Sequence, residues 1–262
     1  MRVPLPDVSS IPGVLGEICR DRAADYADQP LEVISDARVP SRRFENALKS
    51  GGLQLIAEVK RSRPSEVINL ELNAVSAAQQ YVAGGASAVS VLTEPRRFHG
   101  SLSDARDVIG AVGVPVLRKD FTVHPRMVTE ALEIGASAVL LLVNVLGKLT
   151  RSYIELTHHC GLDALVEVHT EEELDVALNA GARIIGVNNR DLHTLEINLG
   201  TAPRVGLLAR EYDFDGVLIA LSGYSNRAEL ISLEGVFDAV LIGSSLAGAA
   251  DIEASTRALL GR

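Results

Sequence analysis

Two of the four lysines in the chain lie where a run of apolar residues ends, each close to an acidic side chain. Lys60 comes directly after the run Leu53–Val59, which contains Glu58, and Lys119 lies in the run Pro115–Asp120. A buried lysine can have its pKa lowered toward neutrality and act as an acid, a base or a Schiff-base nucleophile, which an arginine cannot do. The alternative is that both lysines are purely structural.

Two further apolar runs end in residues suited to proton transfer and hydrogen bonding, Glu167 and Asn188. Glu58 and Lys60 are two residues apart, so in a strand they point to the same side. If the runs converge, two carboxylates and two ammonium groups share one partly desolvated site, which can protonate one atom and deprotonate another. A buried network of salt bridges without chemistry is the competing interpretation.

Small residues close the last two apolar runs, Ser222 with Gly223 and Gly243 with Ser244. Glycine lets the backbone approach a ligand closely, and many barrels bind phosphate at this place with backbone N–H groups and hydroxyls. A single glycine after a strand is often only a turn residue. The presence of both pairs predicts a phosphorylated small-molecule substrate.

These residues need a scaffold that brings the ends of several strands together. Most of the apolar runs are hydrophobic at nearly every position, which is typical of parallel strands covered on both faces. The eight runs are Leu53–Val59, Ser87–Thr93, Pro115–Asp120, Ala138–Asn144, Asp163–His169, Arg183–Asn189, Val217–Gly223 and Ala239–Ser245. They predict an α/β fold, a closed (β/α)8 TIM barrel whose site lies at the C-terminal ends of the strands. A doubly wound open sheet is the alternative, although no GxGxxG motif follows the first run.

Helical patterns fill the gaps between these runs. Glu71–Gly84, Pro125–Gly135 and Thr170–Gly181 each end on glycine, as helix C-termini often do. In the third, Thr170 is followed three residues later by Glu173, which is the spacing of a capping box. Each gap is therefore expected to contain a crossover helix.

About fifty residues precede the first strand, more than a barrel requires. Ile11–Asp25 and Ser41–Ser50 are predicted to be helical, with Leu31–Val39 as the connector between them. The first of these helices has an apolar face, which favours a packed extension over a loosely attached tail. We expect a single domain over residues 1–262, with an N-terminal helical extension at 1–50 and the barrel at 51–262.

The composition excludes several classes of protein. Of the 262 residues 47% are apolar, which is too many for a disordered chain, and the net charge of −9 argues against nucleic-acid binding. The longest apolar stretch, Ala138–Val143, is too short to cross a membrane, and Met1–Gly13 contains prolines and an acid where a signal peptide is apolar. We therefore expect a cytoplasmic protein with no membrane partner.

Cysteine and histidine give no sign of a metal site. Cys19 and Cys160 belong to no CxxC pair, so neither a disulfide framework nor a zinc pattern is indicated. The adjacent residues His158, His159 and Cys160 look like the end of a helix, and neighbours in sequence rarely converge on one ion. No metal is expected.

A third segment of interest follows the second apolar run. Arg96 and Arg97 are either a solvated pair of charges or part of a loop that folds Phe98 over an aromatic substrate.

Taken together, these motifs resemble the indole-3-glycerol-phosphate synthase family, the barrel enzymes of tryptophan biosynthesis, over nearly the whole chain. The resemblance is carried by VLGEICRDRAAD near the start, IAEVKR at 56–61, SVLTEPRRFHGS at 90–101, VPVLRKDF at 114–121, ALVEVH at 164–169, IIGVNNRDL at 184–192 and LIGSSL at 241–246. It implies a lyase that closes 1-(2-carboxyphenylamino)-1-deoxyribulose 5-phosphate to indole-3-glycerol phosphate. Carbon dioxide and water are lost, and no metal or organic cofactor takes part.

The resemblance also implies roles for individual residues. Lys119 is similar to the general acid that polarises the ribulose carbonyl, and Lys60 to a second lysine near the substrate carboxylate that is a candidate acid for dehydration. Glu167 resembles the acid/base partner, and Glu58 the carboxylate that orients the lysine and the substrate hydroxyls. Further matches are Asn188 and Arg190 as the polar pair after the sixth strand, Phe98 as the residue that packs on the ring, and Ser222, Gly223, Gly243 and Ser244 as the phosphate site.

Two positions depart from the family pattern. After the first strand the family reads Ser-Pro-Ser followed by Lys-Gly, whereas this chain has Arg63, Pro64 and Ser65 followed by Glu-Val. At the seventh strand the family reads Ser-Glu-Ser-Gly, and here Leu221 replaces the glutamate. We count Arg63 and Ser65 among the expected substrate contacts.

Three interpretations follow from these departures. The chain is a working synthase with Arg63 as an extra anion contact, a paralogue that acts on a modified aryl-aminodeoxyribulose phosphate, or a non-catalytic subunit that holds a partner enzyme of the same pathway. A pocket blocked by Leu221 and Arg63 favours the last, and an open pocket in which Lys119 faces Glu167 favours catalysis.

Overall fold

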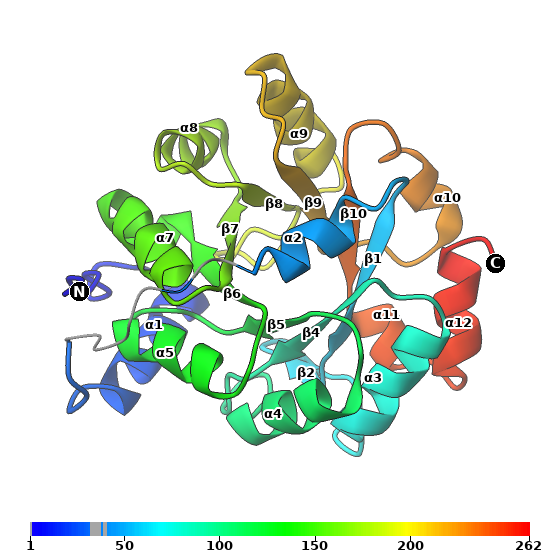
Figure 1. Cartoon of the computed structure of the whole chain (residues 1–262), viewed down its shortest axis with the longest axis horizontal. Helices are drawn as coiled ribbons and strands as arrows, with labels where there is room; N and C mark the ends of the chain where they lie inside the picture. The colour runs from blue at the N-terminus through cyan, green and yellow to red at the C-terminus, as the bar shows by residue number, and fades with distance from the viewer. Residues whose placement is uncertain (1, 32–37, 39–40) are drawn as a thin grey trace.

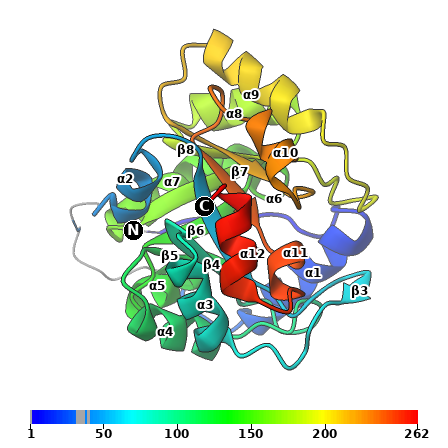
Figure 2. The ribbon, with the colours of Figure 1, turned by 90° about the vertical axis from the view of Figure 1, so that its right-hand side faces the viewer.

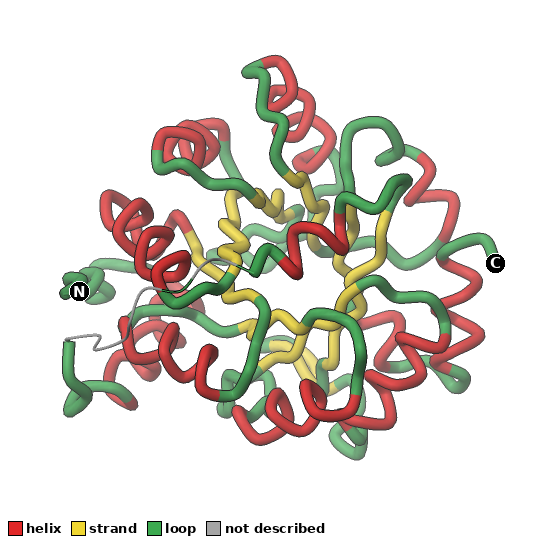
Figure 3. The backbone as a smooth tube through the Cα atoms, in the orientation of Figure 1, coloured by secondary structure: helices red, strands yellow, loops and turns green. Residues whose placement is uncertain are grey.

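The computed structural model describes residues 2–31, 38 and 41–262 of the chain. Within these residues eight parallel strands form a closed barrel, in the order β1-β10-β9-β8-β7-β6-β5-β4 (Figures 1 and 3). The strands are β1 Gln54–Val59, β4 Ala88–Leu92, β5 Val116–Lys119, β6 Ala138–Leu142, β7 Asp163–Val168, β8 Ile184–Asn188, β9 Val217–Leu221 and β10 Ala239–Ile242. The predicted TIM barrel is confirmed, and the open sheet is excluded because β1 pairs with both β4 and β10.

Helices surround the barrel, as Figure 1 shows. They are α3 Ala74–Ala83, α4 Leu102–Ala111, α5 Pro125–Glu133, α6 Val143–Leu146, the 3-10 turn η1 Gly147–Leu149, α7 Thr150–His159, α8 Glu171–Asn179, α9 Thr201–Glu211, α10 Arg227–Ile231, α11 Ser244–Ala247 and α12 Ile252–Leu259. Alternate strand residues face outward and pack on the helices, while the others fill the barrel interior. None of the helices in the described ranges is long and apolar enough to cross a membrane.

The two predicted N-terminal helices are present, α1 Gly13–Asp25 and α2 Arg43–Leu48. Phe44 and Leu48 of α2 are fully buried in the same cluster as the barrel interior, and the carboxylate of Asp163 accepts the backbone N–H of Phe44 at 3.1 Å. Asp163 begins β7, so α2 closes the N-terminal end of the barrel, where Figure 3 shows it lying across the ring of strands. Figure 2 shows α1 well apart from α2.

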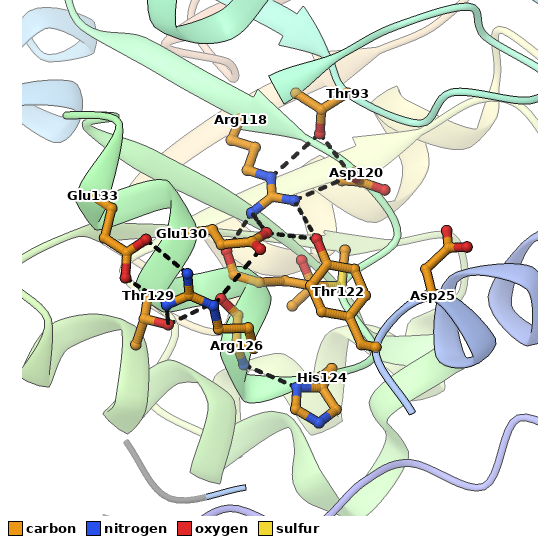
Figure 4. Close-up of polar contacts among 12 residues, drawn as sticks. Asp25, Thr93, Arg118, Asp120, Thr122, His124, Arg126, Thr129, Glu130 and Glu133 are labelled. Atoms are coloured by element: carbon orange, nitrogen blue, oxygen red, sulfur yellow. Dashed lines mark hydrogen bonds and ion pairs between the residues drawn. The ribbon is translucent and has the colours of Figure 1, made fainter. Parts of the chain in front are cut away.

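Helix α1 is fastened to β5 by a buried ion pair. The guanidinium of Arg22 donates to both carboxylate oxygens of Asp120, at 3.0 and 2.9 Å. Thr93 also donates to Asp120, and the guanidinium of Arg118 lies beside them (Figure 4). Burial by itself lowers the pKa of Arg22, but the charge of Asp120, the Tyr26 hydroxyl and the hydrogen bonds to Asp120 and Asp25 together outweigh it and raise that pKa. Asp120 adjoins Lys119, so α1 is tied to the end of the strand that carries this lysine.

Two local predictions need correction. The run Ala138–Asn144 is not a strand throughout, because β6 ends at Leu142 and Asn144 lies in α6. Thr170 does accept the backbone N–H of Glu173, but the Glu173 carboxylate accepts from the backbone of His169 instead of completing a capping box.

Of two other segments, one was not predicted and one was predicted but is mostly not described. The short antiparallel pair β2 Ser62–Arg63 and β3 Glu66–Val67 follows β1 and was not anticipated. The predicted connector Leu31–Val39 falls, apart from Leu31 and Arg38, outside the described residues.

Candidate active site

A cavity of about 260 Å³ opens at the C-terminal ends of the strands. All but one of the thirteen residues proposed from the sequence line it. They are Glu58, Lys60, Arg63, Ser65, Phe98, Lys119, Asn188, Arg190, Ser222, Gly223, Gly243 and Ser244. The sequence-based set therefore converges on one pocket.

Glu167 is the exception, since it lies below the cavity and does not line it. Its side chain is 2% exposed, and its Oε1 accepts a hydrogen bond from Asn188 Nδ2 at 2.8 Å. Its Oε2 lies 3.8 Å from Lys119 Nζ and has no hydrogen-bond partner among the described residues. Glu167 thus reaches the cavity through Lys119 and Asn188, both of which border it.

Glu58 and Lys60 point to the same side of β1, as their spacing predicted. Glu58 Oε1 lies 2.5 Å from Lys60 Nζ, and Ser90 donates to Glu58 Oε2 at 3.0 Å. Burial by itself raises the pKa of Glu58, but the charges of Lys60 and Lys119 and these hydrogen bonds together hold it below the usual range. Glu58 is therefore a carboxylate at neutral pH and is paired with the Lys60 side chain.

The apolar wall of the cavity comes largely from residues that the motif analysis did not single out. Val14, Leu15 and Ile18 of α1 line it, and Phe121 packs on Phe98 with ring centroids 5.8 Å apart. The one-face spacing of the α1 residues predicted burial but gave no sign that they face the site. The wall suits a flat aromatic group.

A buried carboxylate shapes the loop that carries Phe98. Glu94 is fully buried and accepts the backbone N–H groups of Arg96, Arg97 and Phe98 at 2.7 to 2.9 Å. Arg96 pairs with Asp25, and Arg97 with two other acids of α1. Both arginines therefore form ion pairs with α1, and neither lines the cavity. Phe98 does line the cavity, which agrees with the interpretation that this loop brings Phe98 to the site.

The end of the cavity at β9 and β10 has an unusual backbone. Ser222 and Gly223 both have positive φ, +64° and +94°, in a region that favours glycine. A Cβ on Gly243 would lie 2.8 Å from Glu58 Oε1 and 3.3 Å from Lys60 Nζ. The glycine at position 243 therefore leaves room for the Glu58–Lys60 pair beside the proposed phosphate site.

We expect Gly243→Ala to lower kcat/KM by roughly tenfold or more. The added methyl group displaces the Glu58–Lys60 pair, and small displacements of reacting groups slow a reaction strongly. Steady-state kinetics on the purified variant measure this. Gly110→Ala is the matched control, since a Cβ there meets no atom within 4 Å. Equal kinetics for the two variants contradict the expectation.

Arg63 and Leu221, the two departures, border the cavity without filling it. Arg63 pairs with Glu66 on the β2–β3 hairpin. The pKa of Arg190 is lowered, first by the burial of Arg190 itself and second by the nearby charge of Arg63. Two guanidinium groups on one rim favour an anionic ligand. Leu221 is 2% exposed and packs in the barrel interior, so it replaces a charge by an apolar wall.

Comparison with known proteins identifies the family. The family described as "Indole-3-glycerol phosphate synthase" matches residues 15–259. The indole-3-glycerol phosphate synthase of Deinococcus radiodurans is 52% identical over 263 aligned residues, covering 98% of each chain. That of Mycolicibacterium vanbaalenii is 42% identical, covering 93% of this chain and 89% of its own.

A solved structure adds support for the fold alone. KGPDC from Streptococcus mutans superposes with a TM-score of 0.63 at 11% identity, covering 80% of this chain and 96% of that one. The family match spans most of the chain, and the relatives align over nearly their full length. The chain therefore belongs to the indole-3-glycerol phosphate synthase family.

Proposed function

We propose that the pocket closes 1-(2-carboxyphenylamino)-1-deoxyribulose 5-phosphate to indole-3-glycerol phosphate, the reaction implied by the family. The observation that carries this proposal is the placement of Lys119. Its ammonium group borders the cavity and lies 3.8 Å from the buried carboxylate of Glu167. A proton donor at the cavity wall with a carboxylate behind it is what general acid catalysis needs.

In the first step Lys119 gives a proton to the ribulose carbonyl oxygen while the carboxylated ring carbon attacks the carbonyl carbon. The bond to the carboxylate then breaks, carbon dioxide leaves, and the electron pair restores the aromatic ring. In a site with little water, a charged donor aimed at the forming alkoxide contributes most to the rate.

The second stage removes water. Lys60, paired with Glu58, protonates the departing hydroxyl, and the proton lost from the carbon next to nitrogen returns to the Lys119 and Glu167 pair. One proton per turnover is consumed overall, because a carboxylate leaves as neutral carbon dioxide. Glu58 also orients the substrate hydroxyls.

Substrate binding divides between the two ends of the cavity. Phe98 and the α1 wall hold the aromatic ring, while Ser222 with Gly223 and Gly243 with Ser244 hold the phosphate. Ser65, Arg63 and Arg190 lie where they can bind the substrate carboxylate or phosphate. Because α1 contributes to this wall, we treat residues 1–262 as one domain. Membership in a biosynthetic family supports a cytoplasmic location.

A second candidate is a substrate that carries a further group on the ring. Leu221 favours it, because an apolar side chain replaces a carboxylate at the cavity wall. The third candidate, a subunit that only holds a partner enzyme of the pathway, is disfavoured because Arg63 and Leu221 leave the cavity open and Lys119 faces Glu167.

Incubation with the anthranilate-derived ribulose phosphate tests the proposal, with indole fluorescence and carbon dioxide release as readouts. The chain has no Trp, so the protein background is low. Indole formation at about 1 per second or faster supports the proposal. Tight substrate binding without indole overturns it, and turnover of ring-substituted substrates alone establishes the second candidate.

A further inference from the structure

His169 lies next to Glu167 at the end of β7, outside the machinery described so far. Its Nε2 is 3.8 Å from Glu167 Oε1, and its Nδ1 is 3.3 Å from the Glu173 carboxylate of α8. The same Glu173 oxygen accepts the backbone N–H of His169 at 2.7 Å. The ring is therefore held between two carboxylates on different elements.

The two oxygens of Glu167 have different surroundings. Oε1 faces Asn188 Nδ2 and His169 Nε2, whereas Oε2 faces Lys119. Both Oε2 and His169 Nε2 are buried without a hydrogen-bond partner in the described part of the chain. Oε1 is thus held by the hydrogen bond from Asn188 and lies 3.8 Å from His169 Nε2, while Oε2 is directed at the lysine.

Only the imidazolium form is attracted to both carboxylates, through the 3.3 Å contact of Nδ1 with Glu173 and the 3.8 Å ion pair of Nε2 with Glu167. A neutral imidazole has one N–H and one lone pair, so either tautomer turns a lone pair toward Glu167 or toward Glu173. The imidazolium ion carries an N–H on both nitrogens and so turns positive charge toward both carboxylates. Loss of its proton therefore weakens one of the two contacts, whichever tautomer results.

We propose that His169, in its imidazolium form, is a positioning residue that holds Glu167 in place behind Lys119. It acts through Glu167, since it does not line the cavity. This inference rests on the proposed function, because it assigns His169 to the same acid/base pair. His169 and Asn188 together fix Oε1, so that Oε2 keeps its position relative to the Lys119 ammonium group.

The electrostatic surroundings agree with a charged ring. Burial lowers the pKa of His169, but Glu173, Glu167 and Asp191 outweigh it and raise that pKa above its usual 6.5. Glu167 lies on β7 and His169 directly follows this strand. Glu173 comes from α8 and Asp191 from the segment after β8, while Lys119 of β5 faces the group from beyond Glu167. The acids of three separate segments thus favour the imidazolium form.

The pH dependence follows from the direction of this shift. Because the pKa of the folded state is raised, the stabilisation is fully present below the unfolded value of about 6.5 and is lost as pH rises through the folded pKa. Activity is expected to change in the same direction, with kcat falling on the alkaline side as Glu167 loses its support.

Two substitutions separate the functions of the two ring nitrogens. In His169→Gln the amide nitrogen can take the place of Nε2 beside Glu167 without titrating, whereas in His169→Asn it can only take the place of Nδ1. We expect His169→Gln to keep kcat within about fivefold and to lose the alkaline limb due to histidine. His169→Asn should lower kcat by roughly 10- to 100-fold with KM nearly unchanged, because small misplacement of reacting groups is that costly.

The experiment records kcat and KM against pH for both variants and titrates the imidazole by NMR in the wild-type protein and in Glu167→Gln. His193→Gln is the control, since His193 is exposed and makes no side-chain contact with the acid/base pair. A wild-type pKa above 6.5 that falls in Glu167→Gln is the expected result.

The inference is overturned if His169 titrates at or below 6.5, or if His169→Asn keeps the wild-type pH profile and kcat. It is also overturned if both variants lose kcat equally, because that indicates a merely structural ring. Absence of turnover in the wild-type protein refutes the proposed function instead, and the NMR titration still tests His169.

Discussion

Lys119→Ala is expected to lower kcat by about 10²- to 10⁴-fold, the range for loss of a positioned general acid, while substrate affinity falls far less. The lysine borders the cavity with 19% of its side chain exposed and faces Glu167. Its proton is needed when charge develops on the carbonyl oxygen, so its removal affects the transition state more than the bound substrate. Single-turnover kinetics and calorimetric binding on the same preparation measure the two effects.

Lys148→Ala is the matched control for that variant, because Lys148 is an exposed residue of η1 away from the cavity. Lys148→Ala should leave both kcat and substrate affinity unchanged. Equal losses of turnover and affinity in Lys119→Ala contradict the role of Lys119 as the acid and leave it only a binding role.

Asp120→Ala is expected to lower the free energy of unfolding by about 3–5 kcal/mol, which is the usual cost of leaving a buried charge without its partner. Asp120 is 1% exposed and accepts two of the three hydrogen bonds of the Arg22 guanidinium, with Arg118 alongside. The substitution leaves two buried guanidinium groups short of an anion. Urea denaturation followed by circular dichroism measures the change.

Asp107→Ala provides the comparison, since Asp107 is exposed on α4 and should change stability by less than about 0.5 kcal/mol. Asp120→Ala should also lower kcat, because α1 supplies part of the cavity wall and Asp120 adjoins Lys119. An unchanged free energy of unfolding shows that the attraction between Arg22 and Asp120 does no more than offset the desolvation cost of burying the pair.

The barrel could be predicted from the sequence because both faces of its strands are buried. Runs such as those around Leu140 and Ile219 have no polar face, which separates them from surface helices and edge strands. The error at Asn144 arises from the same property. Val143 and Val145 are buried in α6 as they would be in a strand, so hydrophobicity alone does not mark where β6 ends.

The site could be predicted only in part, for a different physical reason. Parallel strands bring their C-terminal ends to one place, so Lys60, Lys119 and Asn188 were expected to converge. Whether a given side chain lines the cavity or lies behind its wall depends on the direction of the side chain and on packing. The position of Glu167 below the cavity and the contribution of α1 could therefore not be read from spacing.

The pairing of β1 with β10 also has a consequence for synthesis of the chain. Gln54 lies opposite Ala239, so the last strand to leave the ribosome is the one that closes the barrel. Until then the nascent chain has a curved sheet with two unpaired edges, β1 and β9, and such edges promote association with other chains. Any such unfinished sheet is exposed until β10 pairs with it, because contacts so distant in sequence form late.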